Sequence, residues 1–128
     1  MFVCETDVLQ GPSGNHRTLN HITCTTRNVV YAILCTECSM VYVGQTSQRL
    51  GDRFAQHIRS VRNNDGQPVA RHFNSQDHNP YHSCLKICGL VECIGTTTTR
   101  LNLETRLIHK LGTLHPYGLN TRHDVRVH

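Results

Sequence analysis

The stretch from Val29 to His57 constrains the fold more than any other part of this chain. Its first six residues are all apolar or aromatic, a pattern that predicts a strand buried on both faces. A turn with two cysteines follows, and then a shorter β-rich run that ends at Gly44. The sequence therefore predicts a β-hairpin. Tyr31 lies near the start of its first strand and Tyr42 near the end of its second, so the two phenols are expected side by side.

The segment after the hairpin predicts a helix over about residues 49–63, because apolar residues recur there every three or four positions. Arg49, Arg53 and His57 follow one another at intervals of four and form a row beside that apolar stripe. The row therefore borders the core, close to the two tyrosines. An arginine and a histidine that meet two phenols in one hollow form a candidate anion or phosphate site.

The chain has 128 residues, enough for one domain with a modest core. It contains no run of about 18 apolar residues, so no membrane span is expected. Its N-terminus lacks the basic and apolar regions of a signal peptide, so we expect an intracellular rather than a secreted protein. The net charge of +4 favours a polyanionic partner, although an ordinary basic surface explains this charge equally well.

Three further elements complete the expected fold. A short helix begins at Pro68, residues 85–94 read as a strand, and a second long helix runs over about residues 100–111. Together they indicate a small α/β (α+β) domain with a three-stranded, mainly antiparallel sheet flanked by helices. The expected organisation is an N-terminal extension over residues 1–27, the main domain over 28–120 and a frayed tail over 121–128.

Glu104 is the most informative single residue of the second half. Apolar residues stand three, four and seven positions after it, so its carboxylate points where the apolar face of the helix points. A carboxylate in that place is costly unless it is paired or bound to a metal. One interpretation is a ligand for a divalent cation that prefers oxygen, such as Mg²⁺. The other is an ion pair with Arg100, or a helix phase that exposes the side chain. The spacing fits both equally.

Seven cysteines, an odd number in a chain without an export signal, argue against a complete disulfide framework. Cys35 and Cys38 are two residues apart at the tip of the predicted hairpin, a spacing that lets both thiolates bind one zinc ion. Cys24 and His21 are nearest in sequence and are the expected second half, which would make the N-terminal extension zinc-binding. The alternatives are a redox pair and two free thiols in a turn. Further candidate thiols are Cys84, Cys88 and Cys93.

Single histidines and asparagines carry weaker signals. His57 is a candidate general base or phosphate donor, and its alternative is a partly buried histidine with a structural role. His72 and His78, six residues apart, are candidates for metal or DNA contacts. Asn120 has the alternative of an ordinary turn former.

The order of these residues resembles the GIY-YIG endonuclease family. The elements that carry the resemblance are Val29-Val30-Tyr31, Tyr42-Val43-Gly44, Arg53, His57, Glu104 and Asn120. Val29 stands where the family has its first glycine, and the long gap between arginine and glutamate implies an insertion around residues 63–80. The cysteine pair between the tyrosines and the ending IHKLGTLHPYGLN are similar to the endonuclease domain of Penelope-like retroelements.

This resemblance implies a metal-dependent DNA endonuclease, of a nicking type, that hydrolyses a phosphodiester bond. Glu104 would hold a catalytic Mg²⁺ or Mn²⁺, and Arg53 would stabilise charge on the phosphate. Tyr31, helped by His57, would activate the attacking water. Tyr42 would line the site and hydrogen-bond its neighbours.

Other residues receive supporting roles from the same resemblance. Asn120 would anchor the glutamate end of the site, and Gly44 would let the backbone pass close to the helix. A Zn²⁺ ion at the hairpin tip would be structural, because the tip points away from the tyrosines. The residues expected to contact DNA are Arg49, Arg59, Arg62, Arg71 and His72.

The retroelement resemblance also implies a reverse transcriptase domain in the parent polypeptide and a nuclear location. Two other functions fit the sequence. One is a nucleic-acid-binding module of the same fold without cleavage, which would show salt-dependent binding and no turnover. The other is a zinc-stabilised protein-interaction domain in which Glu104 forms a structural ion pair.

Overall fold

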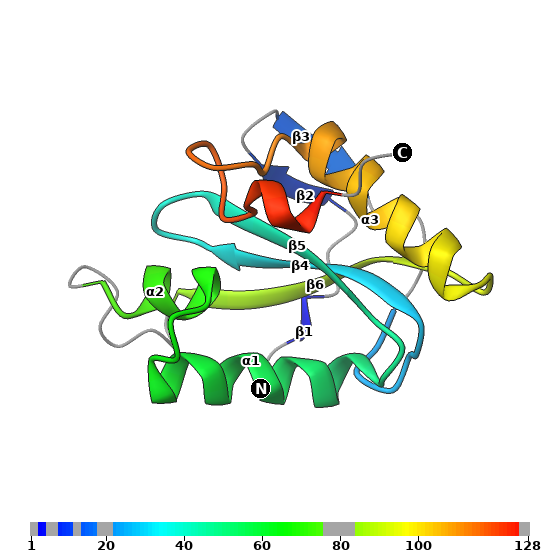
Figure 1. Cartoon of the computed structure of the whole chain (residues 1–128), viewed down its shortest axis with the longest axis horizontal. Helices are drawn as coiled ribbons and strands as arrows, with labels where there is room; N and C mark the ends of the chain where they lie inside the picture. The colour runs from blue at the N-terminus through cyan, green and yellow to red at the C-terminus, as the bar shows by residue number, and fades with distance from the viewer. Residues whose placement is uncertain (1–2, 5–7, 12–13, 18–21, 76–83, 126–128) are drawn as a thin grey trace.

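The computed structural model describes residues 3–4, 8–11, 14–17, 22–75 and 84–125. Its centre is a sheet of four strands in the order β1-β6-β4-β5 (Figure 1). Strand β4 (Val29–Cys35) pairs antiparallel with both β5 (Met40–Thr46) and β6 (Leu85–Glu92). The predicted three-stranded antiparallel sheet is therefore confirmed. A two-residue strand, β1 (Val3–Cys4), adds a parallel neighbour to β6 that the sequence pattern did not reveal.

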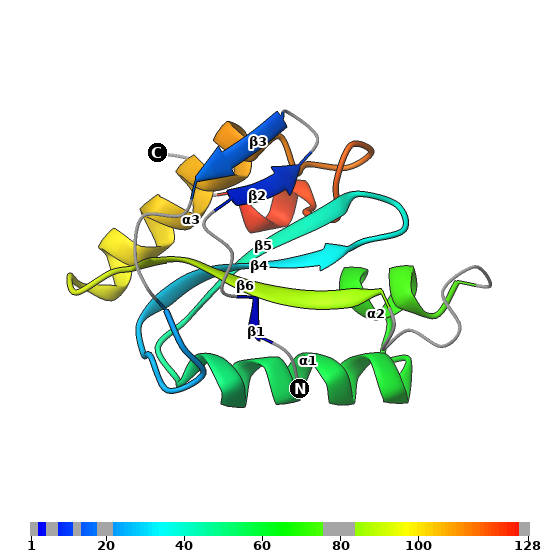
Figure 2. The same ribbon diagram turned by 180° about the vertical axis from the view of Figure 1, so that it is seen from behind.

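Helices cover both faces of this sheet. α1 (Leu50–Asn63) and α2 (Pro68–Phe73) lie on one side, and α3 (Thr97–Leu111) lies on the other (Figure 1). A separate two-stranded sheet of β2 (Val8–Gly11) and β3 (Gly14–Arg17) lies on the α3 side (Figure 2). In the part of the chain that the structure describes, no helix is long and apolar enough to cross a membrane.

The continuous apolar sequence of β4 builds two cores, one on each face. Tyr31 and Ile33 pack with α1 and α2, whereas Val30 and Ala32 pack with α3. All four side chains are fully buried, as the sequence predicts for a strand without polar positions. Each large apolar side chain buried in this way contributes about 1.5–3 kcal/mol to stability. The alternation of β4 thus decides which side chains meet α1 and which meet α3.

Local signals set the helix boundaries. α1 ends where Asn64 adopts a left-handed conformation, with φ of 48°, and donates its N–H to the Val61 carbonyl. The hydroxyl of Thr96 accepts the backbone N–H of Thr99 at 3.2 Å and caps α3. Because of this cap, α3 begins three residues earlier than its apolar pattern alone predicts. It ends at Gly112, which has a φ of 68°.

The chain returns after α3 to cover the outer edge of β5. The backbone N–H of Leu119 donates to the Val41 carbonyl at 2.9 Å. The side-chain amide of Asn120 accepts the Val43 N–H at 2.8 Å and donates to the Val43 carbonyl at 2.9 Å. Its oxygen also accepts the hydroxyl of Thr113 at 2.7 Å. These contacts bring the end of α3 and the C-terminal segment against the hairpin.

The segment that follows Asn120 is ordered, so the predicted frayed tail is wrong for its first part. Residues Arg122–Asp124 form the 3₁₀ helix η3. The Asp124 carboxylate accepts the backbone N–H of Thr121 at 2.8 Å and the Asn120 amide at 3.2 Å. This capping box closes the segment against the domain. Residues 126–128 lie outside the described residues.

Candidate active site and cysteine–histidine cluster

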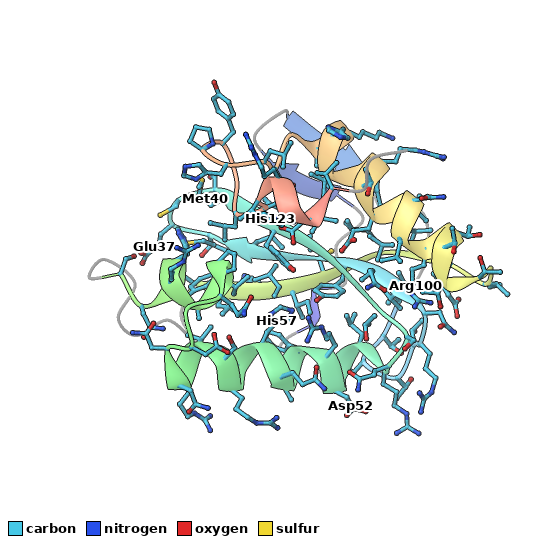
Figure 3. The ribbon with its side chains drawn as sticks, viewed as in Figure 1. Glu37, Met40, Asp52, His57, Arg100 and His123 are labelled. Carbon is cyan, nitrogen blue, oxygen red and sulfur yellow. The ribbon has the colours of Figure 1, made fainter. Side chains whose placement is uncertain are left out.

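The predicted meeting of tyrosine, arginine and histidine is present on the α1 side of the sheet. The hydroxyl of Tyr31 lies 2.6 Å from Nε2 of His57 and accepts Nε–H of Arg53 at 3.2 Å. The His57 ring stands edge-on to both phenols, with centroids 5.7 Å from those of Tyr31 and of Tyr42. Figure 3 shows His57 between α1 and the sheet. Four side chains from two strands and one helix therefore share one site.

The strand register explains how both phenols reach this site. Tyr31 pairs with Gly44 across the hairpin, and Tyr42 pairs with Ile33, two positions along the same face. A Cβ atom on Gly44 would lie 2.6 Å from the Tyr31 hydroxyl oxygen, so only glycine lets that phenol lie across β5. The glycine was expected to accommodate the helix; the structure shows that it accommodates Tyr31.

Burial sets the protonation states of the central pair. Burial, and then the charge of Arg53, lowers the pKa of His57 to about 3, so the imidazole is neutral at neutral pH. Burial raises the pKa of Tyr31 to about 12, although Arg53 opposes this shift. The Tyr31 hydroxyl is therefore protonated. A hydrogen bond from this hydroxyl to Nε2 of His57 requires the tautomer with the His57 hydrogen on Nδ1. Burial, followed by the nearby Tyr31, also raises the pKa of Tyr42.

Two carboxylates act on these phenols from the opposite layer. Glu104 is buried on α3, and its charge raises the pKa of both Tyr31 and Tyr42. The charge of Asp124 has the same effect on both phenols. Sequence reasoning identified Glu104 and missed Asp124, which carries only the local signal of a Thr-x-x-Asp capping box.

Arg100, the arginine expected as an alternative partner of Glu104, donates to two neutral amides. Its Nε–H reaches Oε1 of Gln45 at 2.7 Å, and a terminal nitrogen reaches Oδ1 of Asn28 at 3.2 Å. The arginine thereby joins the start of α3 to the open end of the hairpin. These contacts give Arg100 a structural role at the sheet, and both interpretations of Glu104, the ion pair and the metal ligand, stay predictions.

Asn120 is completely buried, and its amide hydrogen-bonds Val43, Thr113 and Asp124 rather than the tyrosines. Its contacts hold the C-terminal segment, with Asp124, against β5. The turn-former alternative does not describe such a fully bonded side chain. Asn120 is thus a residue that positions the carboxylate side of the site.

A cavity of about 230 Å³ opens beside the tyrosine, arginine and histidine. Its lining consists of Tyr42, Arg53, Gln56, His57, Ser60, Asp65, Gln67, Pro68 and Val69. A terminal nitrogen of Arg53 donates to Oε1 of Gln56 at 2.8 Å, which fixes the guanidinium at the cavity wall. Gln56 is a site residue that no sequence motif indicated. A cation held in this way suits an anionic group.

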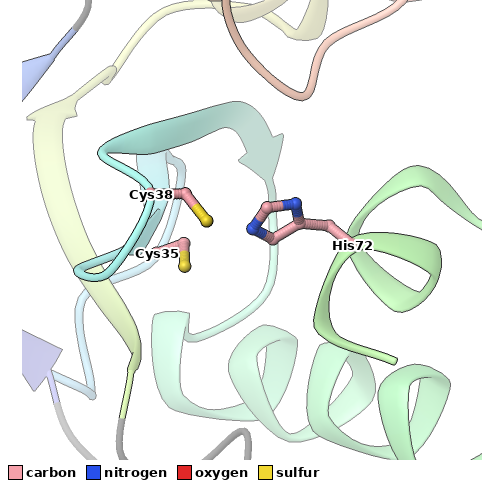
Figure 4. Close-up of side chains that lie close together, drawn as sticks. All are labelled: Cys35, Cys38 and His72. Atoms are coloured by element: carbon pink, nitrogen blue, oxygen red, sulfur yellow. The ribbon is translucent and has the colours of Figure 1, made fainter. Parts of the chain in front are cut away.

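The arginines expected to contact DNA lie on the surface, but His72 does not belong with them. Arg49, Arg59, Arg62 and Arg71 are all exposed. The His72 ring instead turns toward the hairpin tip, where its nitrogen and the sulfurs of Cys35 and Cys38 all lie within 4.8 Å of one another (Figure 4). This cluster joins α2 to the end of β4.

The Cys24 part of the predicted zinc site is corrected by the structure. Cys24 is exposed, and its carbonyl accepts the Gly51 N–H at the start of α1. That places Cys24 near the start of β4 and Cys35 at its end, and seven strand residues span more than about 20 Å. One ion cannot bridge that length. His21 lies outside the described residues, so its part in the site stays a prediction, and the cluster that the described residues form contains His72.

The Cys84 thiol lies against the same cluster. It is buried, and burial together with the neighbouring Cys35 thiol raises its pKa to about 12. Its backbone carbonyl accepts the Thr36 N–H at 2.9 Å, which ties the start of β6 to the hairpin tip. Cys84 thus lies beside Cys35, whereas the ligand atoms that lie within 4.8 Å of one another are those of Cys35, Cys38 and His72.

Comparison with known proteins agrees with this geometry. The model of the GIY-YIG catalytic domain family matches residues 27–118. The catalytic domain of the homing endonuclease I-TevI is similar in fold, with a TM-score of 0.62 and 19% sequence identity over 73% of this chain and 97% of that domain. No curated protein sequence matches the chain. With the family model covering most of its length, the chain belongs to the GIY-YIG catalytic domain family.

Proposed function

We propose that this chain is a metal-dependent DNA endonuclease that hydrolyses phosphodiester bonds and nicks one strand. The observation that carries the proposal is the hydrogen-bonded set of Tyr31, His57 and Arg53, of which His57 and Arg53 line a cavity. Membership of the GIY-YIG catalytic domain family supports DNA as the substrate. A cationic guanidinium beside a protonated phenol and a neutral imidazole supplies both phosphate binding and a proton acceptor.

Proton transfer in this proposal runs from water through Tyr31 to His57. The attacking water gives its proton to the Tyr31 oxygen while the phenol passes its own proton to Nε2 of His57, 2.6 Å away. The phenol then never has to exist as a free phenolate, which its pKa of about 12 disfavours. The charge of Arg53 lowers the pKa of His57 in the free protein, and the negative charge of a bound phosphate offsets it. Substrate binding thus favours the protonated imidazole.

The catalytic cation of this proposal is Mg²⁺ or Mn²⁺, held by Glu104. The residues fit such an ion, because Mg²⁺ keeps several waters and needs only one or two protein carboxylates. Glu104 provides one, and Asp124 is the second carboxylate whose charge acts on both phenols. When bound, the cation polarises the scissile phosphate and stabilises the leaving oxygen.

A structural Zn²⁺ ion at Cys35, Cys38 and His72 completes the proposed metal content. The two sulfurs and the imidazole nitrogen are close enough to share one ion, and these are the ligands that zinc prefers. Cys84 is the candidate for the fourth position. Such an ion would fix α2 to the hairpin tip, four residues along β4 from Tyr31.

Plasmid nicking by the purified chain with Mg²⁺ or Mn²⁺ tests the catalytic proposal. The parent should convert supercoiled to open-circle DNA, whereas Glu104→Gln and Arg53→Ala should lose this activity. Glu92→Gln and Arg106→Ala, which change exposed side chains of the same types, should retain it.

Two outcomes would favour the other functions. A folded parent that binds DNA in a salt-dependent way without nicking would favour a binding module. A parent that neither binds nor nicks DNA, and loses stability in Glu104→Gln, would favour a protein-interaction domain.

The retroelement type is a further part of the proposal and rests on the cysteine pair and the sequence ending. It includes a reverse transcriptase domain in the parent polypeptide and a nuclear location. Sequencing the transcript that encodes this chain tests the first, and microscopy of the tagged parent protein tests the second. A transcript without a reverse transcriptase reading frame would remove the retroelement assignment and leave the nuclease proposal intact.

A further inference from the structure

The cavity beside the catalytic residues has a second half that the proposed hydrolysis does not use. This half is formed by the last turns of α1 and the segment that leads into α2. Its lining residues are Ser60, Asp65, Gln67, Pro68 and Val69. Four of them, Asp65, Gln67, Pro68 and Val69, belong to the region that the sequence indicates as an insertion.

The two ends of the cavity carry opposite charges. Arg53 stands at the catalytic end, and Asp65 stands at the other. The Asp65 carboxylate is held by the hydroxyl of Ser60, which donates to Oδ1 at 2.6 Å, and by the backbone N–H of Gln67, which donates to the same oxygen at 3.1 Å. These hydrogen bonds lower the pKa of Asp65, so it is ionised at neutral pH.

This polarity restricts what the cavity can hold. A phosphate at the Asp65 end would face a negative charge, so a second backbone phosphate does not fit there. A group that donates a hydrogen bond does fit, because both hydrogen bonds to Asp65 within the described residues use Oδ1 and leave Oδ2 for a ligand. Val69, Pro68 and the Tyr42 ring add apolar surface for a flat ring.

We propose that this half of the cavity is a subsite for the nucleobase next to the scissile phosphate, and that Asp65 selects a base with an exocyclic amino group. The inference rests on the proposed nuclease function. A phosphate at Arg53 and an amino group at Asp65 match the two ends of one nucleotide. A volume of about 230 Å³ is smaller than the cavities of about 300–1,000 Å³ that enclose larger ligands, and it suits a single unstacked nucleotide.

Titration of the intact chain with dCMP and with dTMP, followed by amide NMR, tests the subsite. The two nucleotides are similar in size, but cytosine carries an amino group where thymine carries a carbonyl oxygen. The amide of Gln67, which bonds Asp65, is the reporter. We expect dCMP to shift this amide and to bind roughly 10-fold more tightly than dTMP.

Two variants distinguish a direct contact of Asp65 with the base from a general effect of negative charge on nucleotide binding. Asp65→Ala should reduce the preference for dCMP to less than about twofold. Asp52→Asn removes an exposed carboxylate from the first turn of α1, the helix that precedes Asp65, on the side away from the sheet (Figure 3), and should keep the full preference.

Three results would overturn the subsite: equal affinity for the two nucleotides, shifts confined to residues outside the cavity, or a preference that survives in Asp65→Ala. Any of these in a chain that nicks DNA would refute the subsite alone. A preference for dCMP that depends on Asp65, in a chain that does not nick, would refute the catalytic proposal and keep the subsite.

Discussion

Replacing Asn120 by alanine should strongly destabilise the fold. The side chain is completely buried and makes hydrogen bonds to the N–H and the carbonyl of Val43, to the Thr113 hydroxyl and to Asp124. Alanine leaves both main-chain groups of Val43 without these partners, in a part of the sheet edge that water does not reach.

The size of the effect follows from these contacts. A buried polar group left without its hydrogen bond costs about 1–3 kcal/mol. Two such groups, together with the vacated amide volume, give a loss of roughly 3–6 kcal/mol. Small domains have a total stability of about 5–15 kcal/mol, so the variant should lie near the limit of folding.

Urea unfolding of the parent and the variant measures this loss. With a slope of about 2 kcal/mol per molar urea, the midpoint should fall by roughly 1.5–3 M at an unchanged slope. Asn102→Ala is the matched control, because Oδ1 of Asn102 is buried and has no hydrogen-bond partner among the described residues. That control should change stability by less than about 1 kcal/mol. A loss below about 1 kcal/mol in Asn120→Ala, or equal losses in the two variants, would refute this account of the β5 edge.

Three further predictions concern the site and its metals. Gly44→Ala should reduce nicking about 10²–10⁴-fold in a folded protein, because the added Cβ would displace the Tyr31 hydroxyl; wild-type activity would contradict the assigned register. As the pH falls from about 6 to about 4, the parent should lose up to about 1.4 kcal/mol of its free energy of unfolding per pH unit, relative to His57→Gln. The unfolded histidine binds a proton below its ordinary pKa of 6.5, whereas the folded one does so only near about 3; parallel slopes in urea unfolding against pH would contradict the buried neutral imidazole. Cys38→Ser should remove bound zinc in metal analysis and Cys24→Ser should retain it; loss of zinc in both variants would restore the original ligand assignment.

The parts of the site that the sequence predicted are those governed by local periodicity. The two phenols follow from a hairpin register that alternation and turn position determine, and Arg53 and His57 follow from a helical spacing of four. Glu104 was recognisable because a carboxylate on an apolar face conflicts with its surroundings.

The parts that escaped prediction depend on packing between distant segments. His72 reaches the cysteines because α2 packs beside the hairpin tip, and no local pattern specifies that contact. Asp65 and Asp124 occupy ordinary turn and cap positions, and only the folded chain shows that they face the cavity and the phenols. The parallel pairing of β1 with β6 joins residues more than eighty positions apart.

The Asn120 amide also closes a strand edge that could otherwise pair with a second copy of the chain. An unpaired strand edge is a template for pairing with another chain, and residues 40–43 of β5 are apolar and without charge. A side-chain amide satisfies the Val43 edge but offers no continuous row of main-chain groups on its far side, so the sheet ends there. Loss of this side chain should therefore cause aggregation through β5 before complete unfolding. Light scattering from Asn120→Ala should rise at urea concentrations at which most of the helical signal is still native.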